Sequence, residues 1–177
     1  MYVRGAKNRE EVWLLDRLDE LGLRDPAFRS RDYVIALDEQ TGEKAGFGRI
    51  RIHPEGPCEF TCIGVLPDWR DQGVGAHVLE RLVELARDQG VETAYALTSE
   101  GGYLSQFGFE RVSEEELPDP LGERLEEVQA HDADARPFRL DLDDFIMPEK
   151  FREKFKSAGE EEEPIDAEEE SPEDFGI

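Results

Sequence analysis

A glycine-containing turn in front of a helical pattern is the part of this sequence best suited to chemistry. In "CIGVLPDWRDQGVGAHVLERL", residues 62–82, a β-like apolar segment leads through Pro67 into Arg-Asp-Gln-Gly-Val-Gly and then into apolar residues at helical spacing. The first N–H groups of a helix have no partner within it, and the helix dipole adds about half a positive charge there. Such a turn can hold a pyrophosphate on main-chain amides.

Two common phosphate sites do not fit this turn. It lacks the lysine and the Ser or Thr of a P-loop. It also follows three predicted strands rather than opening a strand–helix–strand unit, which argues against a dinucleotide-binding fingerprint. Arg-x-x-Gly-x-Gly is weakly specific by itself, so the elements around it decide how it is interpreted.

These elements alternate between strands and helices. Strands are predicted at 2–6, 32–38, 45–53, 58–66, 91–97 and 108–113, and helices at 8–22, 74–90 and 101–107. Asn8 and Glu11 have capping-box spacing at the start of the first helix. Residues 33–66 are expected to form an antiparallel meander, and the whole order predicts a single α/β domain with a mixed, mostly antiparallel sheet flanked by helices.

The C-terminal third extends this domain from about residue 113. A loop at 114–122, a helix at 123–130, a closing strand at 137–144 and a helix at 148–157 are predicted there. The domain is expected to span residues 1–155. Residues 156–177 are predicted to be a disordered acidic tail, since they offer almost nothing to bury.

The charge is strongly negative throughout. The chain has 21 Lys and Arg against 44 Asp and Glu, and sixteen of the basic residues are Arg. Concentrated salt screens the self-repulsion of such a surface, so we expect a halophilic, cytoplasmic protein, with an acidic mesophilic protein as the alternative. The charge argues against nucleic-acid binding, and the lack of a long apolar run argues against a membrane span or a signal peptide.

Cysteine and histidine give no sign of a disulfide or a metal site. Cys58 and Cys62 lie on one predicted strand, where their Cα atoms would be about 13 Å apart, too far to bridge. They are expected to be free thiols in the core. His53, His77 and His131 show no ligand spacing, so no metal is predicted.

Longer motifs resemble the GCN5-related N-acetyltransferase (GNAT) superfamily. "VLPDWRDQGVGAHVLERLVELA" resembles its acetyl-CoA-binding motif, and "YLSQFGFERV" is similar to its later helix–strand signature. "CEFTCIGVLPDWR" with "ALTSEGGYLSQFGFERVSEEELP" resembles more narrowly the acetyltransferase domain of N-acetylglutamate synthases and related amino-acid acetyltransferases. The resemblance covers residues 1 to about 112.

The resemblance implies a sheet splayed between its fourth and fifth strands, with the pantetheine of acetyl-CoA in the gap. Main-chain groups of Ile63, Gly64 and Val65 would pair with pantetheine, and an amide there would polarise the thioester carbonyl. The pyrophosphate would be held by the remaining cofactor candidates, which are Arg70, Gln72, Gly73, Val74, Gly75 and Ala76.

The implied reaction is direct attack of an amine on acetyl-CoA, which needs a base, an oxyanion donor and an acid. Glu59 matches the superfamily's glutamate position and is the base candidate, with a solvated strand carboxylate as the alternative. Acidic neighbours are expected to raise its pKa. The superfamily's usual tyrosine is replaced by Leu104, so the acid is left open among Tyr103, Ser99, Thr98 and water.

Substrate and partners are less defined. Arg49 and Arg51 share a strand face and could bind a substrate carboxylate, with charge pairing inside the protein as the alternative. The leading hypothesis is acetylation of a small-molecule amine such as an amino acid. Acetylation of a protein or peptide amine and a non-catalytic acetyl-CoA-binding module are the alternatives, and the oligomeric state, including a homodimer, stays open.

Overall fold

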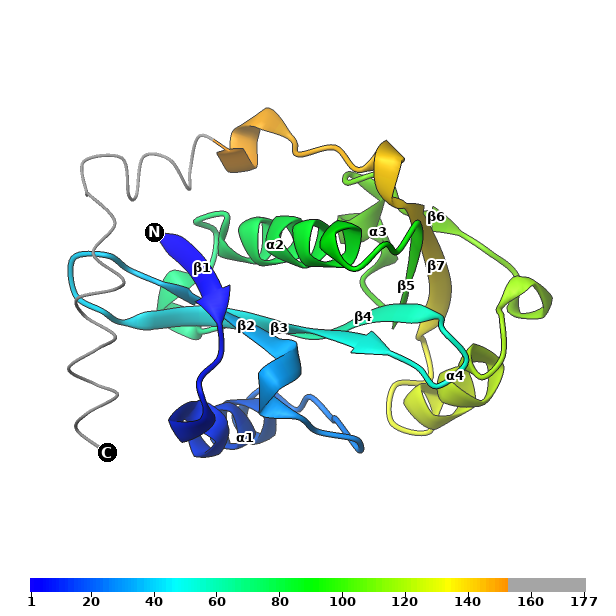
Figure 1. Cartoon of the computed structure of the whole chain (residues 1–177), viewed down its shortest axis with the longest axis horizontal. Helices are drawn as coiled ribbons and strands as arrows, with labels where there is room; N and C mark the ends of the chain where they lie inside the picture. Colours follow the sequence, from blue (N-terminus) through cyan, green and yellow to red (C-terminus); the bar gives the residue numbers. More distant parts are fainter. Residues whose placement is uncertain (153–177) are drawn as a thin grey trace. The chain divides into compact units, whose positions relative to one another are not determined.

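A computed structural model describes residues 1–152 of the 177-residue chain and contains one mixed sheet of seven strands in the order β1-β2-β3-β4-β5-β7-β6. The strands are β1 (Tyr2–Gly5), β2 (Tyr33–Leu37), β3 (Lys44–Ile52), β4 (Cys58–Val65), β5 (Thr93–Thr98), β6 (Glu110–Arg111) and β7 (Arg136–Asp141). The α-helices are α1 (Glu11–Glu20), α2 (Val74–Asp88), α3 (Gly101–Ser105) and α4 (Leu121–Gln129) (Figure 1). The α/β fold with a mostly antiparallel sheet is confirmed.

The chain divides into two compact units. The first comprises residues 1–49, 62–81 and the described residues from Glu149, and the second comprises residues 50–61 and 82–148. Strands β3 and β4 and helix α2 each contribute residues to both units.

The core of the first unit lies where α1 covers β1, β2 and β3. The β1–β2 and β2–β3 pairs are antiparallel, and every residue of β2 is buried. Apolar side chains of α1 meet those of the strands in one cluster, and the ring of Trp13 stands edge-on to Phe47 at 6.0 Å between centroids. The cluster consists of Leu14, Leu18, Tyr33, Ile35, Leu37, Phe47 and Cys62.

Two glycines let β3, β4 and α1 approach closely within this unit. A Cβ atom on Gly46 would lie 2.8 Å from the carbonyl oxygen of Gly64 and 2.9 Å from Val74 Cγ1. A Cβ atom on Gly64 would lie 2.7 Å from Phe47 Cζ and 2.8 Å from Leu21 Cδ1. Side chains at these positions would displace the segment that leads from β4 into the turn before α2.

We expect Gly64→Ala to lower the free energy of unfolding by about 1–3 kcal/mol, because the methyl group overlaps a fully buried ring. Urea unfolding measures the change. Gly5→Ala in β1 is the matched control, since its Cβ meets nothing within 4 Å, and it should change stability by less than about 0.5 kcal/mol. Equal effects of the two substitutions would contradict the close-packing argument.

The second unit is built around β5, β7 and β6. The β5–β7 pair is antiparallel along the whole length of both strands, and β6 pairs with the opposite edge of β7. Strand β4 joins β5 in parallel through only two residue pairs, Cys58 with Ala94 and Glu59 with Tyr95. A Cβ on Gly101, at the start of α3, would overlap the ring of Phe138 on β7, so only glycine fits there.

Most of the predicted elements are present, but β6 and β7 are shorter than predicted, and α4 begins at Leu121, inside the predicted loop at 114–122. Strand β6 has two residues, and β7 ends at Asp141, where a 3-10 turn, Leu142–Asp144, follows. Residues 149–152 are helical; the rest of the predicted 148–157 helix and the predicted disordered tail lie outside the described residues. None of the helices in residues 1–152 is long and apolar enough to cross a membrane.

Candidate active site

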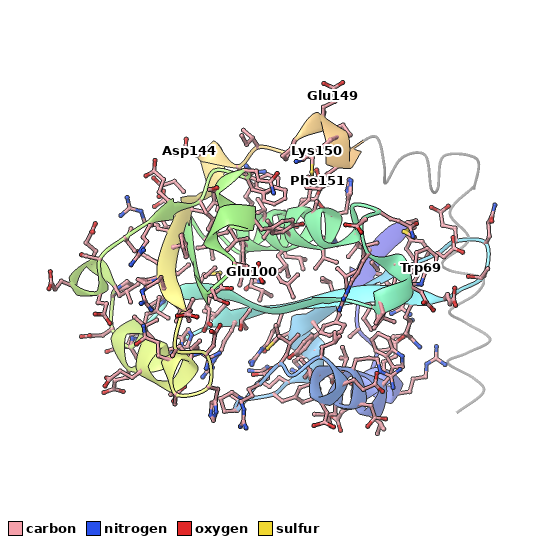
Figure 2. All side chains as sticks on the ribbon, turned by 180° about the vertical axis from the view of Figure 1, so that it is seen from behind. Trp69, Glu100, Asp144, Glu149, Lys150 and Phe151 are labelled. Carbon is pink, nitrogen blue, oxygen red and sulfur yellow. The ribbon has the colours of Figure 1, made fainter. Side chains whose placement is uncertain are left out.

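The turn before α2 is held open by two residues in the left-handed conformation. The 3-10 turn Pro67–Trp69 follows β4, and Trp69 is labelled where this turn ends in Figure 2. Asp71 then has a φ of 64° and Gly73 a φ of 79°. Positive φ is strained for most residues but open to glycine, so the sequence Asp-Gln-Gly is suited to this double bend.

The main-chain amides of this turn have no acceptors within the described part of the chain. No hydrogen bond is donated by the N–H groups of residues 71–76, and the next amide, that of His77, bonds to the carbonyl of Gly73 at 3.2 Å. The side chain of Arg70 is exposed and forms no hydrogen bond within residues 1–152. Six successive donors therefore stand unused at the N-terminus of a 15-residue helix.

Strand β4 reaches this turn with an irregular backbone. Cys62 has a φ of 53°, an outlier within a strand, and its Sγ donates to the carbonyl of Arg24 at 3.3 Å. Ile63, Gly64 and Val65 follow, and the amide of Leu66 returns to the carbonyl of Ala45 at 2.9 Å. Both cysteines are free and buried, as expected.

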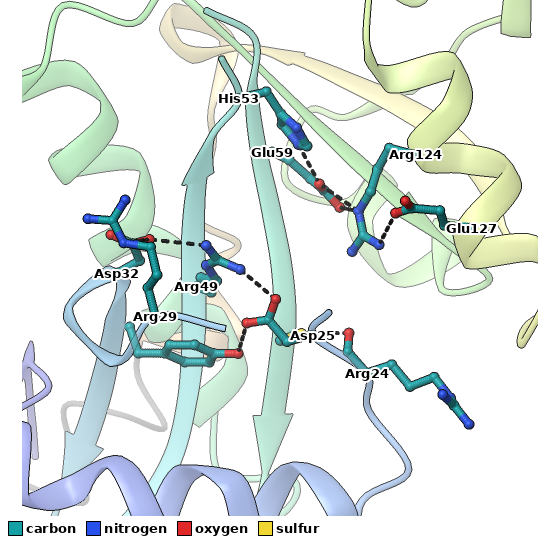
Figure 3. A network of polar contacts seen from close by, with 11 residues as sticks. Arg24, Asp25, Arg29, Asp32, Arg49, His53, Glu59, Arg124 and Glu127 are labelled. Atoms are coloured by element: carbon teal, nitrogen blue, oxygen red, sulfur yellow. Dashed lines mark hydrogen bonds and ion pairs between the residues drawn. The ribbon is translucent and has the colours of Figure 1, made fainter. Parts of the chain in front are cut away.

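Glu59 is fully buried in a polar network of the second unit (Figure 3). Its Oε1 accepts from Nε2 of His53 at 2.9 Å and from Nε of Arg124 at 3.1 Å, and the same Nε lies 3.3 Å from Oε2. The NH1 group of Arg124 also donates to Glu127 at 3.3 Å. Glu59 is therefore not a solvated strand carboxylate.

The expected direction of the pKa shift of Glu59 is wrong. Burial by itself raises the pKa, but the hydrogen bond from His53 and the charge and hydrogen bonds of Arg124 outweigh it and lower the pKa below its ordinary value. A raised pKa was expected because the chain as a whole contains many acidic residues. The carboxylate is instead enclosed by one cation and one imidazole, which favour its charged form.

This shift predicts an acid-labile network. Because the pKa is lower in the folded than in the unfolded chain, ionised Glu59 stabilises the fold above about pH 4.3, the unfolded value, and this contribution is lost as pH falls through the folded pKa. Glu59→Gln should therefore flatten the acid side of the stability–pH curve. Urea unfolding of both proteins at several pH values measures the difference, and parallel curves would contradict the shift.

The candidates for the general acid lie at the end of β5 and in α3. Thr98 Oγ1 accepts a hydrogen bond from the amide of Glu100, the N-cap residue of α3, which is labelled in Figure 2. Ser99 is exposed and forms no hydrogen bond within residues 1–152. Tyr103 is 36% exposed, whereas Leu104 faces the core. Burial raises the pKa of Tyr103 to about 12, which makes the phenol a weaker acid.

Arg49 and Arg51 differ although they are two residues apart on β3. Arg49 is 2% exposed and forms ion pairs with Asp25 and Asp32, and Asp25 also accepts from the hydroxyl of Tyr33 (Figure 3). The guanidinium of Arg49 thus holds the 24–32 segment on the strand. Arg51 has no hydrogen bond in the described residues, and its NH1 is buried without a partner.

Three residues of the Glu59 network carried no site prediction, namely His53, Arg124 and Glu127. His53 could have been found, because the turn "PEGP" between two predicted strands places residues 53 and 59 near each other. The amide of His53 indeed bonds to the carbonyl of Pro57 at 2.9 Å. Arg124 is 65 residues from Glu59 in the sequence and has no local signal.

Several solved structures share this fold. N-acetylglutamate synthase from Neisseria gonorrhoeae, complexed with coenzyme A and N-acetyl-glutamate, aligns with a TM-score of 0.66 at 22% identity over 80% of this chain and 35% of its own. A Mycobacterium tuberculosis protein in complex with CoA aligns at 0.65 and 16% identity over 80% of this chain and 99% of its own. The chain therefore shares its fold with these two proteins.

Sequence comparison gives the family. The model of the acetyltransferase (GNAT) family matches residues 4–109, and the chain belongs to this family. An amino-acid acetyltransferase of Neisseria meningitidis is 31% identical over 114 residues, or 60% of this chain. An amino-acid acetyltransferase of Pseudomonas fluorescens is 39% identical over 61 residues, or 34% of this chain. The matched regions span only 26% and 14% of these relatives.

Proposed function

We propose that this protein is an acetyl-CoA-dependent N-acetyltransferase that acts on a small-molecule amine, most simply an amino acid. The observation that carries the proposal is the row of unused amides at residues 71–76 in front of α2. Membership of the GNAT family supports the class of reaction. The amino-acid acetyltransferases among its relatives support an amino acid as the acceptor.

The turn would bind the cofactor through its pyrophosphate. The free N–H groups and the positive end of the α2 dipole favour an anion, and the side chain of Arg70 can add a charge-assisted hydrogen bond. The positive charge is local and made mostly of backbone, so a protein with a net charge of −23 can still bind a highly anionic coenzyme. Ile63, Gly64 and Val65 would pair with the pantetheine arm.

Acetyl-CoA supplies an activated acetyl thioester, and the chain contributes proton transfer and polarisation. Glu59 belongs to the system that removes the proton of the attacking ammonium. A main-chain amide between Ile63 and Val65 would donate to the carbonyl oxygen as negative charge develops on it. The acid at the thiolate end stays open among Tyr103, Ser99, Thr98 and a water molecule, and burial makes the phenol of Tyr103 a weaker acid than usual.

The carboxylate of an amino-acid substrate would form an ion pair with Arg51. Its guanidinium has no partner within residues 1–152, whereas Arg49 is already bound to two carboxylates. Arg51 is half-buried, and its buried NH1 group lacks a hydrogen-bond partner, which costs free energy until an acceptor reaches it. We therefore assign the substrate carboxylate to Arg51 rather than to Arg49.

Turnover and binding measured together test the function. Thioester consumption is followed with a panel of amino acids, non-carboxylate amines and a lysine-containing peptide, and acetyl-CoA binding is followed by calorimetry. We expect binding and turnover, with amino acids preferred over amines that lack a carboxylate. Preference for the peptide would favour protein acetylation. Binding without turnover of any amine would favour a non-catalytic module, which the leucine at position 104 makes a real alternative.

We also propose that the protein works in concentrated salt, as its charge suggests. Raising potassium chloride from about 0.1 M to about 1 M shortens the Debye length from about 10 Å to about 3 Å. Self-repulsion should then weaken, and the thermal unfolding midpoint should rise. A midpoint that is unchanged or lower at high salt, measured by circular dichroism, would contradict the proposal.

A further inference from the structure

The surroundings of Glu59 make it a poor direct base. Both carboxylate oxygens face Arg124, one of them also accepts from His53, and none of the side chain is exposed. A carboxylate held in this way loses charge-assisted hydrogen bonds when it takes up a proton. A different group must therefore accept the proton from the ammonium group of the substrate.

His53 has the nitrogen that Glu59 lacks. Its Nε2 bonds to a carboxylate that is ionised beside Arg124 and can only accept, so the proton of a neutral ring is assigned to Nε2. Nδ1 then carries a lone pair. Nδ1 forms no hydrogen bond within the described residues and is not among their fully buried unpartnered atoms.

The backbone fixes the ring in place. The amide of His53 bonds to the carbonyl of Pro57 at 2.9 Å, and its carbonyl accepts from Gly56 at 2.8 Å, where a φ of 106° suits glycine. The tight turn between β3 and β4 thus sets the ring against Glu59. An imidazole held in this way presents the lone pair of Nδ1 in a fixed direction, as a general base requires.

We propose that His53 is the immediate proton acceptor of the acetyl transfer proposed above, with Glu59 as its orienting counter-ion and Arg124 as a positioning residue from α4. An N–H bond of the substrate ammonium breaks, and its proton forms a bond to Nδ1. The imidazolium is stabilised by Glu59 through Nε2–H and later releases this proton to solvent. The amine lone pair forms the bond to the acetyl carbon, and the carbon–sulfur bond breaks with its electrons on sulfur. The nitrogen loses its second proton as the amide forms, and this proton neutralises the coenzyme A thiolate.

The variant His53→Gln tests this role. The glutamine amide can still donate to Glu59 from the position of Nε2 but has no basic nitrogen in place of Nδ1. We expect kcat to fall by about 100-fold or more, while the KM for acetyl-CoA and the thermal midpoint stay close to those of the wild type. His131→Gln, at an exposed histidine of the same unit, is the matched control and should change none of these values.

Two results would overturn the inference. Retention of most of kcat by His53→Gln would return the role of base to Glu59, and a loss of kcat accompanied by equal losses of acetyl-CoA binding and stability would show a structural role. Nitrogen-15 NMR of the wild type adds a readout that needs no turnover: Nε2 should carry the proton and Nδ1 should not, and the reverse tautomer would be incompatible. The inference rests on the proposed function, so a wild type without turnover removes both, whereas an active His53→Gln removes only the inference.

Discussion

Gly75→Glu is expected to lower the affinity for acetyl-CoA by at least about 100-fold. Gly75 is the second residue of α2 and lies within the row of amides that have no acceptor. A glutamate there places a carboxylate and a long side chain where the pyrophosphate would lie. The glutamate carboxylate would repel the negative pyrophosphate, and its side chain would overlap it sterically, so both effects weaken binding.

The fold should tolerate this change. Glutamate is a better helix former than glycine, and a negative charge in the first turn of a helix is favourable. Gly122→Glu is the matched control, because Gly122 is also the second residue of its helix and a Cβ there meets nothing within 4 Å. Calorimetry with acetyl-CoA should show binding by the Gly122→Glu variant and none by Gly75→Glu, with both folded by circular dichroism. Equal affinity of the two variants would contradict the placement of the site.

Arg124→Met is expected to cost about 3–5 kcal/mol of unfolding free energy, because it leaves the carboxylate of Glu59 buried without its cation. Methionine keeps much of the volume of the arginine stem, so packing loss adds little. Urea unfolding at neutral pH measures the change. Arg111→Met is the control at an exposed arginine of the same unit and should stay within about 0.5 kcal/mol of the wild type.

Removing both charges separates the cost of an unpaired charge from the worth of the pair. The double variant Glu59→Leu, Arg124→Met should be more stable than Arg124→Met alone, since no buried charge is left without a partner. It should not catalyse acetyl transfer. If the double variant were less stable than either single variant, the energy would come from packing and not from the ion pair.

Local patterns predicted most of the fold. The 3.6-residue apolar period of α2 and the β-branched composition of β2 correspond to buried faces in the structure, and "PEGP" forms the turn between β3 and β4 as expected. The capping box of the first helix was placed one residue too late. The amide of Lys7 bonds to Glu10, which Arg4 holds with two further hydrogen bonds. Lys44 on β3 lies 3.4 Å from the same carboxylate, and such a nonlocal ion pair is not visible in a local pattern.

The order of the last strands and the polar network could not be predicted from local patterns. Strand β7 lies between β5 and β6, so the final strand in the sequence is not at the edge of the sheet. The partner of Glu59 on α4 is likewise distant in sequence. Nonlocal contacts of this kind also reversed the expected pKa shift of Glu59. Composition describes the average surroundings of a side chain, whereas a buried group responds to its few neighbours.

Chemical-shift mapping of the amides tests the central claim most directly. Titration of the nitrogen-15-labelled protein with coenzyme A should shift the N–H signals of residues 72–76 most strongly, because these donors have no acceptor before the pyrophosphate arrives. Binding that leaves those signals in place and shifts amides elsewhere would contradict the account.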